Sequence, residues 1–134
     1  MLETYLSKFA EQFGIEKHKV LEKGIYEQGG LGTSPLFFRE NEPGFYLESL
    51  IAPCPLEKLE ELFSLLMNAN FLGQGTGGAA IALDGEGKFL TLSVDLPYDM
   101  EYKNFLEILE DFINYREYWK EEIQKQQTVK EGIL

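Results

Sequence analysis

The residues of this sequence best suited to ligand chemistry are the glycines between Asn70 and Asp84. Gly73, Gly75 and Gly78 have the G-x-G-x-x-G spacing with which dinucleotide-binding folds bring backbone N–H groups against a pyrophosphate. In those folds the loop leads from a strand into a helix, whose N-terminus attracts the phosphate. Here an apolar helical segment precedes the loop and a predicted strand follows it. We therefore expect a structural role, in which small residues allow a sharp turn and close backbone packing.

Other side chains with chemical potential are isolated or lie in predicted turns. His18 is the only histidine and lies among charged residues, so a solvated position is expected. Cys54 is the only cysteine, and its flanking prolines favour packing at a strand-to-helix corner over reactivity. One histidine and one cysteine do not make a zinc site, and acid pairs such as Asp84 with Glu86 suit turns better than catalysis. The sequence predicts no catalytic residue, no metal and no cofactor.

Arg116 interrupts the apolar stripe of the last predicted helix. Its side chain is expected either to extend outward or to pair with an acid, and a partner-facing role is an alternative. Between Asp99 and Glu122 there are eight acids and three bases, so the opposite face of this helix is acidic. Solubility explains that face more simply than a binding role does.

The first half of the sequence predicts one helix followed by strands. Apolar residues at helical spacing run over residues 2–13. Residues 15–34 are interrupted by glycines and predict a short strand starting near Gly24. Residues 36–40 and 45–52 are rich in aromatic and β-forming residues and flank a Pro-Gly turn, so they predict an antiparallel hairpin.

The second half begins with a helix predicted over residues 56–69, whose apolar side chains cover an arc of about 200°. One sheet covers little more than half of such an arc, so a second buried surface is expected. Residues 79–83 and 89–96 predict another hairpin, and a long helix follows from residue 99 to residue 123. Residues 124–134 lose this periodicity and predict a flexible tail.

These elements predict one α+β domain over residues 1–123, with three helices and about five strands in the order α-β-β-β-α-β-β-α around an antiparallel sheet. The net charge of the 134 residues is −11, which disfavours nucleic acid and anionic membranes as partners. Apolar stretches are short, so neither a signal peptide nor a membrane-inserted helix is expected. The single cysteine fits a reducing compartment, and a cytoplasmic location is predicted.

The order of predicted elements and the segment LLMNANFLGQGTGG (residues 65–78) running into residues 79–84 resemble the class I type III secretion chaperones, the Tir-chaperone-like family. The resemblance extends through the third helix to about residue 122. It implies a small acidic bacterial homodimer without enzymatic activity. Such a protein binds the N-terminal segment of secreted effector proteins, keeps it soluble and secretion-competent, and presents it to the export apparatus. The export ATPase is then a candidate partner.

The resemblance also implies where partners bind. The family's middle helix and adjoining strand lie near the dimer contact, which in this sequence corresponds to Leu62, Leu65, Leu66, Ala69, Ala79 and Ile81. For effector binding by sheet-edge addition and apolar grooves, the candidates on the first helix and first hairpin are Leu6, Phe9, Phe13, Phe37, Phe38, Tyr46 and Leu50. Family members show a clear first strand before that hairpin, whereas residues 23–34 here are interrupted by glycines.

Two alternatives belong to other functional classes. A regulatory adaptor of the same fold would bind a cytoplasmic partner and export nothing, and only its partners would distinguish it. A small nucleotide-binding enzyme built on the Gly73–Gly78 loop is disfavoured by the helix-to-strand order described above.

Overall fold

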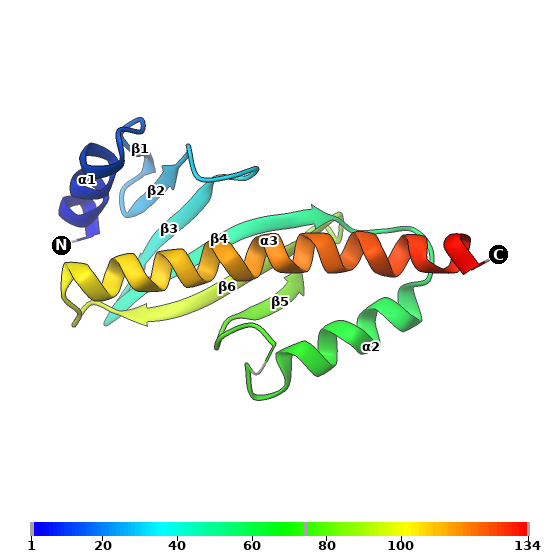
Figure 1. The fold of residues 1–134 in the computed structure, drawn as a ribbon. Coiled ribbons are helices and arrows are strands. Elements are labelled where there is room, and N and C mark those ends of the chain that lie inside the picture. The colour runs from blue at the N-terminus through cyan, green and yellow to red at the C-terminus, as the bar shows by residue number, and fades with distance from the viewer. Residues whose placement is uncertain (1, 74, 134) are drawn as a thin grey trace.

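The protein is described from a computed structural model over residues 2–73 and 75–133, without the side chains of residues 72 and 129–133. Within these residues, three α-helices and a six-stranded antiparallel sheet form the α+β fold that the sequence predicts (Figure 1). In chain order the elements are α1 (Leu2–Phe13), β1 (Lys19–Glu22), β2 (Ile25–Gln28), β3 (Leu36–Asn41), β4 (Gly44–Pro53), α2 (Leu59–Asn70), the short 3₁₀ helix η1 (Phe71–Gly73), β5 (Ala80–Leu83), β6 (Phe89–Pro97) and α3 (Tyr102–Ile133).

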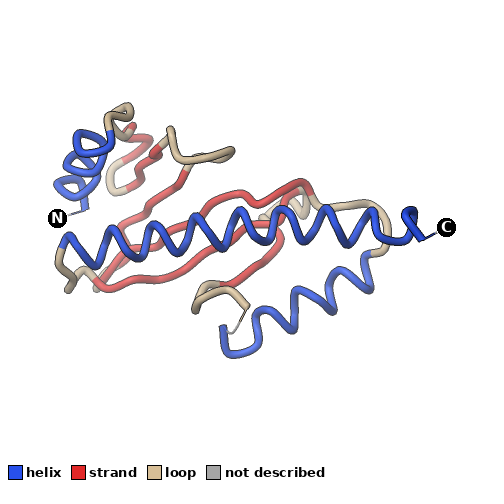
Figure 2. The backbone as a smooth tube through the Cα atoms, viewed as in Figure 1, coloured by secondary structure: helices blue, strands red, loops and turns tan. Residues whose placement is uncertain are grey.

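The strands are ordered β1-β2-β3-β4-β6-β5, and every neighbouring pair is antiparallel. The edges of the sheet are therefore β1 and β5. Figure 2 shows the long helix α3 lying along the sheet, with α1 near the β1 end and α2 beyond β5. The two shorter helices thus flank α3 at opposite ends of the molecule (Figure 1).

The core lies between α3 and one face of the sheet. Along β4 the buried side chains alternate with more exposed ones, as expected for a strand with one covered face. From α3, the ring of Phe105 packs against Phe38 of β3 and Phe45 of β4, with ring centroids 6.2 and 6.1 Å apart. Its centroid is also 5.3 Å from that of Tyr5, so the same ring joins α1 to the core. These aromatic contacts connect α1 and α3 to the sheet.

Strand β1 is the main departure from the expected fold, which had about five strands. All its residues are exposed, and Val20 and Leu21 are 58% and 48% exposed. The strand therefore lacks the alternation of buried and exposed residues by which strands are recognised in a sequence. It exists because it pairs with β2 through a tight turn in which Gly24 has a φ of 79°. The glycine that obscured the pattern is the residue that closes the turn.

Helices α2 and α3 have different ends from those expected. Helix α2 begins at Leu59 because Lys58 has a left-handed backbone, with φ 56°. The Nζ of Lys58 donates to the carbonyl of Gln127 at 2.5 Å, and Nε2 of Gln126 donates to the carbonyl of Lys58 at 3.3 Å. These contacts join the start of α2 to residues that were expected to form a tail.

Residues 124–133 are consequently helical, and α3 starts at Tyr102 rather than at residue 99. The backbone is thus helical where the sequence lacks apolar periodicity, and flexibility of this segment stays a prediction. The hydrogen bonds of Lys58 with Gln126 and Gln127 stabilise α3 at these two residues, where apolar periodicity is missing. A domain boundary at residue 123 stays a prediction.

A test of the central strand pairing uses Gly44, which lies opposite Pro97 in the β4–β6 ladder. A Cβ atom there would lie 1.9 Å from the carbonyl oxygen of Leu96. We expect Gly44→Ala to lower the free energy of unfolding by about 2 kcal/mol or more, because the clash is with backbone. Gly85→Ala is the matched control, since a Cβ at Gly85 meets nothing within 4 Å. Equal urea midpoints for the two variants would contradict the observed register.

Candidate functional site

An apolar groove lies between α1, the β2–β3 loop and α3. Its volume is about 600 Å³, which lies in the size range of small-molecule sites. Helix α1 contributes one wall, the β2–β3 loop contributes the second, and α3 contributes the floor. We call it the α1–α3 groove, and its lining residues are Phe9, Phe13, Ile15, Gly30, Leu31, Leu106, Leu109, Glu110, Ile113 and Asn114.

The α1 wall is made by two aromatic rings one helical turn apart. Phe9 is buried, whereas Phe13 is 55% exposed at the rim, and their centroids are 4.8 Å apart. Glu110 is the one ionisable residue in the lining, so the groove holds no pair of groups able to act as acid and base. Its chemistry suits the burial of apolar side chains from a partner.

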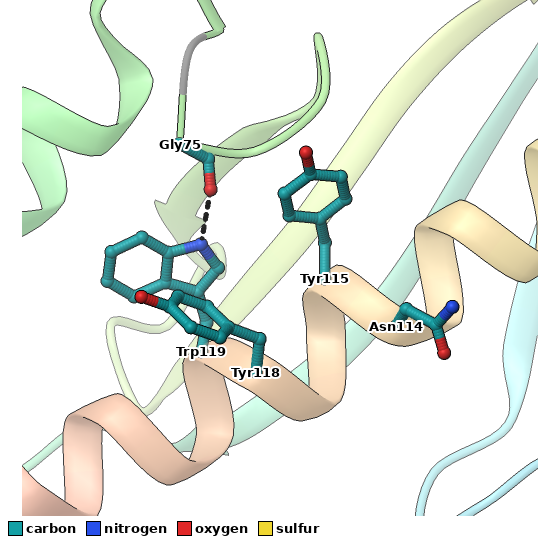
Figure 3. A pocket seen from close by; sticks show the side chains of 5 residues that line it. All are labelled: Gly75, Asn114, Tyr115, Tyr118 and Trp119. Atoms are coloured by element: carbon teal, nitrogen blue, oxygen red, sulfur yellow. Dashed lines mark hydrogen bonds between the residues drawn. The ribbon is translucent and has the colours of Figure 1, made fainter.

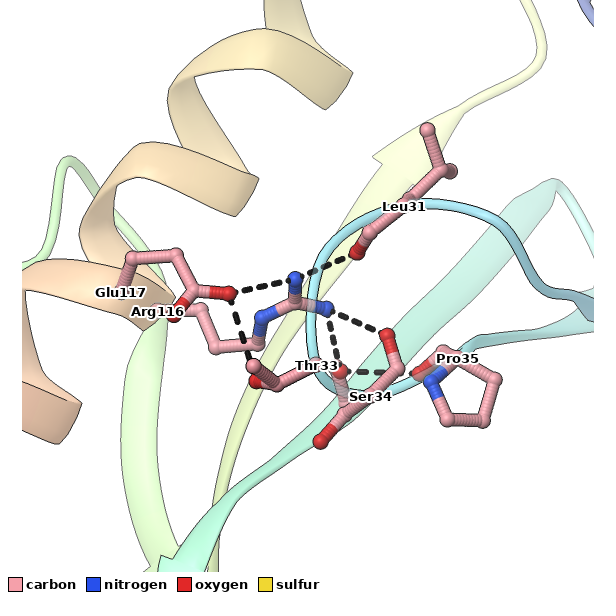
Figure 4. A network of polar contacts seen from close by, with 7 residues as sticks. Leu31, Thr33, Ser34, Pro35, Arg116 and Glu117 are labelled. Carbon is pink, nitrogen blue, oxygen red and sulfur yellow. Dashed lines mark hydrogen bonds and ion pairs between the residues drawn. The ribbon is translucent and has the colours of Figure 1, made fainter.

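The opposite wall is held in place by Arg116, whose side chain is 1% exposed (Figure 4). Nη2 donates to the carbonyl of Leu31 at 2.6 Å and to Oε1 of Glu117 at 3.0 Å. Nη1 donates to the carbonyl of Ser34 at 2.8 Å and to Oγ of Ser49 at 2.9 Å. One guanidinium thus joins α3, the β2–β3 loop and β4, and it fixes the Leu31 wall of the groove.

Of the roles considered for Arg116, pairing with an acid is confirmed, and extension into solvent is wrong. The sequence signal was its position, four residues after Phe112 and three before Trp119, where the apolar stripe faces the core. Its loop partners could not be identified from sequence, because Leu31 and Ser34 contribute main-chain carbonyls. Every residue has a main-chain carbonyl, so residue type gives no indication of such an acceptor.

Glu117 is the acid that offsets this buried charge. Burial by itself raises the pKa of the Glu117 carboxyl, but the hydrogen bond and positive charge of Arg116 outweigh it and lower the pKa below its ordinary value. Thr33 Oγ1 also donates to the same carboxylate oxygen, at 3.4 Å. The carboxylate therefore remains ionised where it ties α3 to the loop.

His18 was expected on the surface, and that prediction was wrong. The residue is 7% exposed, with Nε2 3.7 Å from Oε2 of Glu3 and its ring edge-on to Tyr26 at 5.5 Å. His18 thus lies against Glu3 of α1 and Tyr26 of β2, contacts that the polar neighbours of His18 in the sequence did not indicate. Cys54 is half-buried against the core just after β4, so its predicted packing role is confirmed.

The predicted effector-binding residues are divided between three environments. Leu6 and Phe38 are wholly buried in the core, so they cannot contact a partner without rearrangement. Phe9 and Phe13 come together in the α1–α3 groove. The other three lie on the sheet face away from α3 and are partly exposed: Phe37, Tyr46 and Leu50. A role for each group in binding stays a prediction.

Most of the predicted dimer residues face the inside of the protomer. Five of the six are buried in its own core, and only Leu65 is half-buried; the five are Leu62, Leu66, Ala69, Ala79 and Ile81. The breadth of the apolar arc correctly indicated that α2 has more apolar surface than one chain buries. Which of its side chains face outward depends on how the helix is oriented in the fold, and the arc alone does not give that orientation.

The outward side chains of α2 form a stripe at four-residue spacing that continues into η1, and we call it the α2 stripe: Leu59, Phe63, Met67 and Phe71. Met67 is 72% exposed and Phe71 63% exposed. Beside the stripe is a hollow of about 280 Å³, lined by Phe63, Met67 and Leu83 among others. An exposed apolar stripe with an adjacent hollow is typical of a protein–protein contact.

The glycine loop offers few free donors to a phosphate. The N–H of Gly75 donates to the carbonyl of Ala69 in the last turn of α2, and those of Thr76, Gly78 and Ala79 donate to carbonyls of the connection itself, at 3.0 to 3.4 Å. A Cβ at Gly75 would lie 2.9 Å from the Cα of Ala69, so this glycine packs the loop against the end of α2. These contacts give the loop the structural role expected from its sequence.

The family to which the chain belongs follows from comparison with known proteins. Residues 4–120 match the model of the Tir chaperone protein (CesT) family. The chain belongs to this family. The resemblance to the class I type III secretion chaperones, the Tir-chaperone-like family, is thereby confirmed.

Similar proteins match this chain along most of its length. The Chlamydia pneumoniae protein CPj0713/CpB0740 is 32% identical over 122 residues, covering 89% of this chain and 93% of its own length. Among solved structures, the ExsC–ExsE complex matches with a TM-score of 0.68 at 12% identity, covering 90% of this chain and 91% of that one. The HopA1–SchA chaperone–effector complex matches with a TM-score of 0.67 at 14% identity, covering 90% and 93%. At these identities the structures establish the fold.

A search of the described residues for a helix that is long and apolar enough to cross a membrane found none.

The contribution of Arg116 can be measured by replacing it with the other cationic side chain. We expect Arg116→Lys to lower the free energy of unfolding by about 2–4 kcal/mol, because a single ammonium cannot reach all of the acceptors and leaves buried ones unpaired. Arg39→Lys is the matched control at an exposed arginine and should change it by less than about 0.5 kcal/mol. Comparable urea midpoints for both variants would show that the guanidinium network is dispensable.

Glu117 predicts a specific dependence of stability on pH. Its pKa is lower in the folded than in the unfolded protein, so its contribution is present above the ordinary value of 4.5 and is lost as the pH falls below it. As the pH falls from neutral to below 4.5, we expect the free energy of unfolding to decrease more for wild type than for Glu117→Gln. Glu107→Gln, at an exposed acid of the same helix, should follow wild type. Parallel curves for wild type and Glu117→Gln would refute the coupling.

Proposed function

We propose that this chain is a type III secretion chaperone that holds the N-terminal segment of one or more effector proteins in a soluble, secretion-competent form and presents it to the export apparatus. The α1–α3 groove carries this proposal, because it is a largely apolar surface without paired catalytic groups. Such a surface can bury apolar side chains that would otherwise aggregate. Family membership and the chaperone–effector complex among the similar structures support it.

Strand β1 gives the effector segment a second means of binding. It is an edge of the sheet, with all its residues exposed, and its outer backbone groups face no other strand among the described residues. An extended segment adding to this edge would gain main-chain hydrogen bonds, while its side chains reach Val20 and Leu21. Edge addition supplies affinity with little sequence dependence, and the groove supplies preference for apolar residues.

The proposal includes a homodimer formed through the α2 stripe. Two copies of an exposed α2 stripe can cover each other in a symmetric contact, since the same patch is self-complementary in a two-fold dimer. The hollow beside Leu83 could accept an apolar side chain from the second copy. The proposed dimer has a cytoplasmic location and no enzymatic activity, and the export ATPase is its proposed acceptor.

The chaperone function can be tested by co-expression with secreted proteins encoded near this gene. We expect the soluble yield of the matching effector's N-terminal segment to rise with the wild-type protein. Phe13→Glu should reduce that yield several-fold, because a charge at the groove rim opposes burial of apolar side chains. Thr4→Glu places the same charge at an exposed site on α1 and should have no effect.

The outcomes of this experiment separate the functional classes. Binding of an effector that both variants support equally would remove the groove from the proposal. Stable binding only to a protein that is never exported would favour the regulatory adaptor. Failure of every encoded effector segment to bind would overturn the chaperone function for this chain.

The dimer is tested by two adjacent substitutions on α2. Met67→Asp puts a charge in the α2 stripe, whereas Asn68→Asp adds the same charge about 100° around the helix, away from it. We expect light scattering to give a dimer mass for wild type and Asn68→Asp and a monomer mass for Met67→Asp. The reason is that burying an unpaired charge in a dry contact costs several kcal/mol. A monomeric wild type at micromolar concentration would exclude the dimer.

A further inference from the structure

A second hollow lies on the opposite flank of α3 from the α1–α3 groove. It is bounded by the glycine loop and α3, has a volume of about 460 Å³, and is lined by Gly75, Asn114, Tyr115, Tyr118 and Trp119. Figure 3 shows Tyr115 and Trp119 pointing from α3 toward the loop, with Tyr118 beside Trp119. We call it the aromatic cleft. Neither the α1–α3 groove nor the α2 stripe uses its three aromatic rings.

The walls of the aromatic cleft are held by contacts with the glycine loop. Trp119 is 5% exposed, and its Nε1 donates to the carbonyl of Gly75 at 2.7 Å. Tyr118 packs edge-on against Trp119, with centroids 5.3 Å apart and planes at 89°. A Cβ at Gly77, whose φ is 66°, would lie 2.4 Å from the Tyr115 ring, so loop and ring are in close contact. The rings are therefore positioned before any ligand binds.

Acidic side chains of α3 lie on the same side of the helix as these rings. Asp111 lies one turn before Tyr115 and lines a smaller hollow of about 110 Å³ that Tyr115 also borders. Helical spacing places Glu122 on the same side of α3 as Tyr118, one turn after it, and Glu107 on that side about three turns before it. Lys125 lies 3.6 Å from Glu122 and offsets part of this charge. The cleft thus combines exposed aromatic surface with an excess of negative charge.

This combination selects one class of ligand. A cation over an aromatic face is attracted by the ring quadrupole, and a guanidinium can stack on the ring while its N–H groups face a carboxylate. A purely apolar ligand would desolvate the acids without compensation, and an anion would be repelled. The charge of −11 over the whole chain adds long-range attraction for a basic partner.

We propose that the aromatic cleft is a docking site for a basic segment of a partner protein, in which an arginine side chain lies across Tyr115 and Tyr118 with its guanidinium toward Asp111. The site goes beyond the proposed chaperone function and does not depend on it. Its lining shares only Asn114 with that of the α1–α3 groove.

The test uses the full chain and a short capped peptide in which Arg alternates with Gly. Calorimetry should show saturable binding that weakens as salt is added, and the fluorescence of Trp119, the single tryptophan, should change in parallel. A peptide with neutral citrulline in place of each Arg should bind at least about threefold more weakly. Tyr118→Ala and Asp111→Asn should each cause a loss of similar size.

Matched controls separate the aromatic cleft from a general charge effect. Phe13→Ala removes an exposed aromatic ring from the other flank of α3, and Asp99→Asn removes an exposed carboxylate before α3 begins. Both should bind the Arg peptide as wild type does. Three results would overturn the proposal: absence of saturable binding, equal binding of the citrulline peptide, or equal losses in the controls. A Tyr118→Ala variant with a changed molecular mass would also overturn it, since a second copy would then cover the cleft.

Discussion

The packing of α3 along one face of the sheet is the contact on which the other features depend. Its buried stripe of Phe105, Leu109, Phe112, Trp119 and Ile123 covers β4 and reaches Phe38 of β3, and each of its two flanks then forms one side of a hollow. On one flank α1 completes the α1–α3 groove, and on the other the glycine loop completes the aromatic cleft. A single helix therefore supplies the floor of one surface and the wall of the other.

Arg116 is a buried charged residue within that stripe, and the burial of its charge is unfavourable by itself. A guanidinium at this depth loses nearly all of its hydration, which is tolerable only because carbonyl, hydroxyl and carboxylate oxygens replace the water. An apolar residue could fill the position but would not bind the β2–β3 loop. We infer that the network exists to hold that loop, and through Leu31 the shape of the α1–α3 groove.

Helix α2 has an inner and an outer apolar face with different environments. Its inner side chains, among them Leu62 and Leu66, complete the protomer's own core beside Ile81 of β5. Its outer side chains leave the α2 stripe open. The glycine-rich connection from α2 to β5 makes this arrangement possible, because Gly75 allows the loop to lie against Ala69 at the end of the helix. The same loop supplies the carbonyl that fixes Trp119.

The sequence by itself determined the class of fold, the three helices, both hairpins and the family, because these are expressed in local periodicity, turn residues and the segment from residue 65 to residue 84. Strand β1, the buried His18 and the last turns of α3 escaped it, since each depends on a partner distant in sequence. The site was only partly predictable for the same reason. Apolar residue types identify α1 and α2 as sources of binding surface, but Phe9 and Phe38 are alike as residues, and only tertiary packing places one beside the groove and the other inside the core. Exposure is a property of the assembled layers, so the tertiary structure alone decided which apolar side chains remain available to a partner.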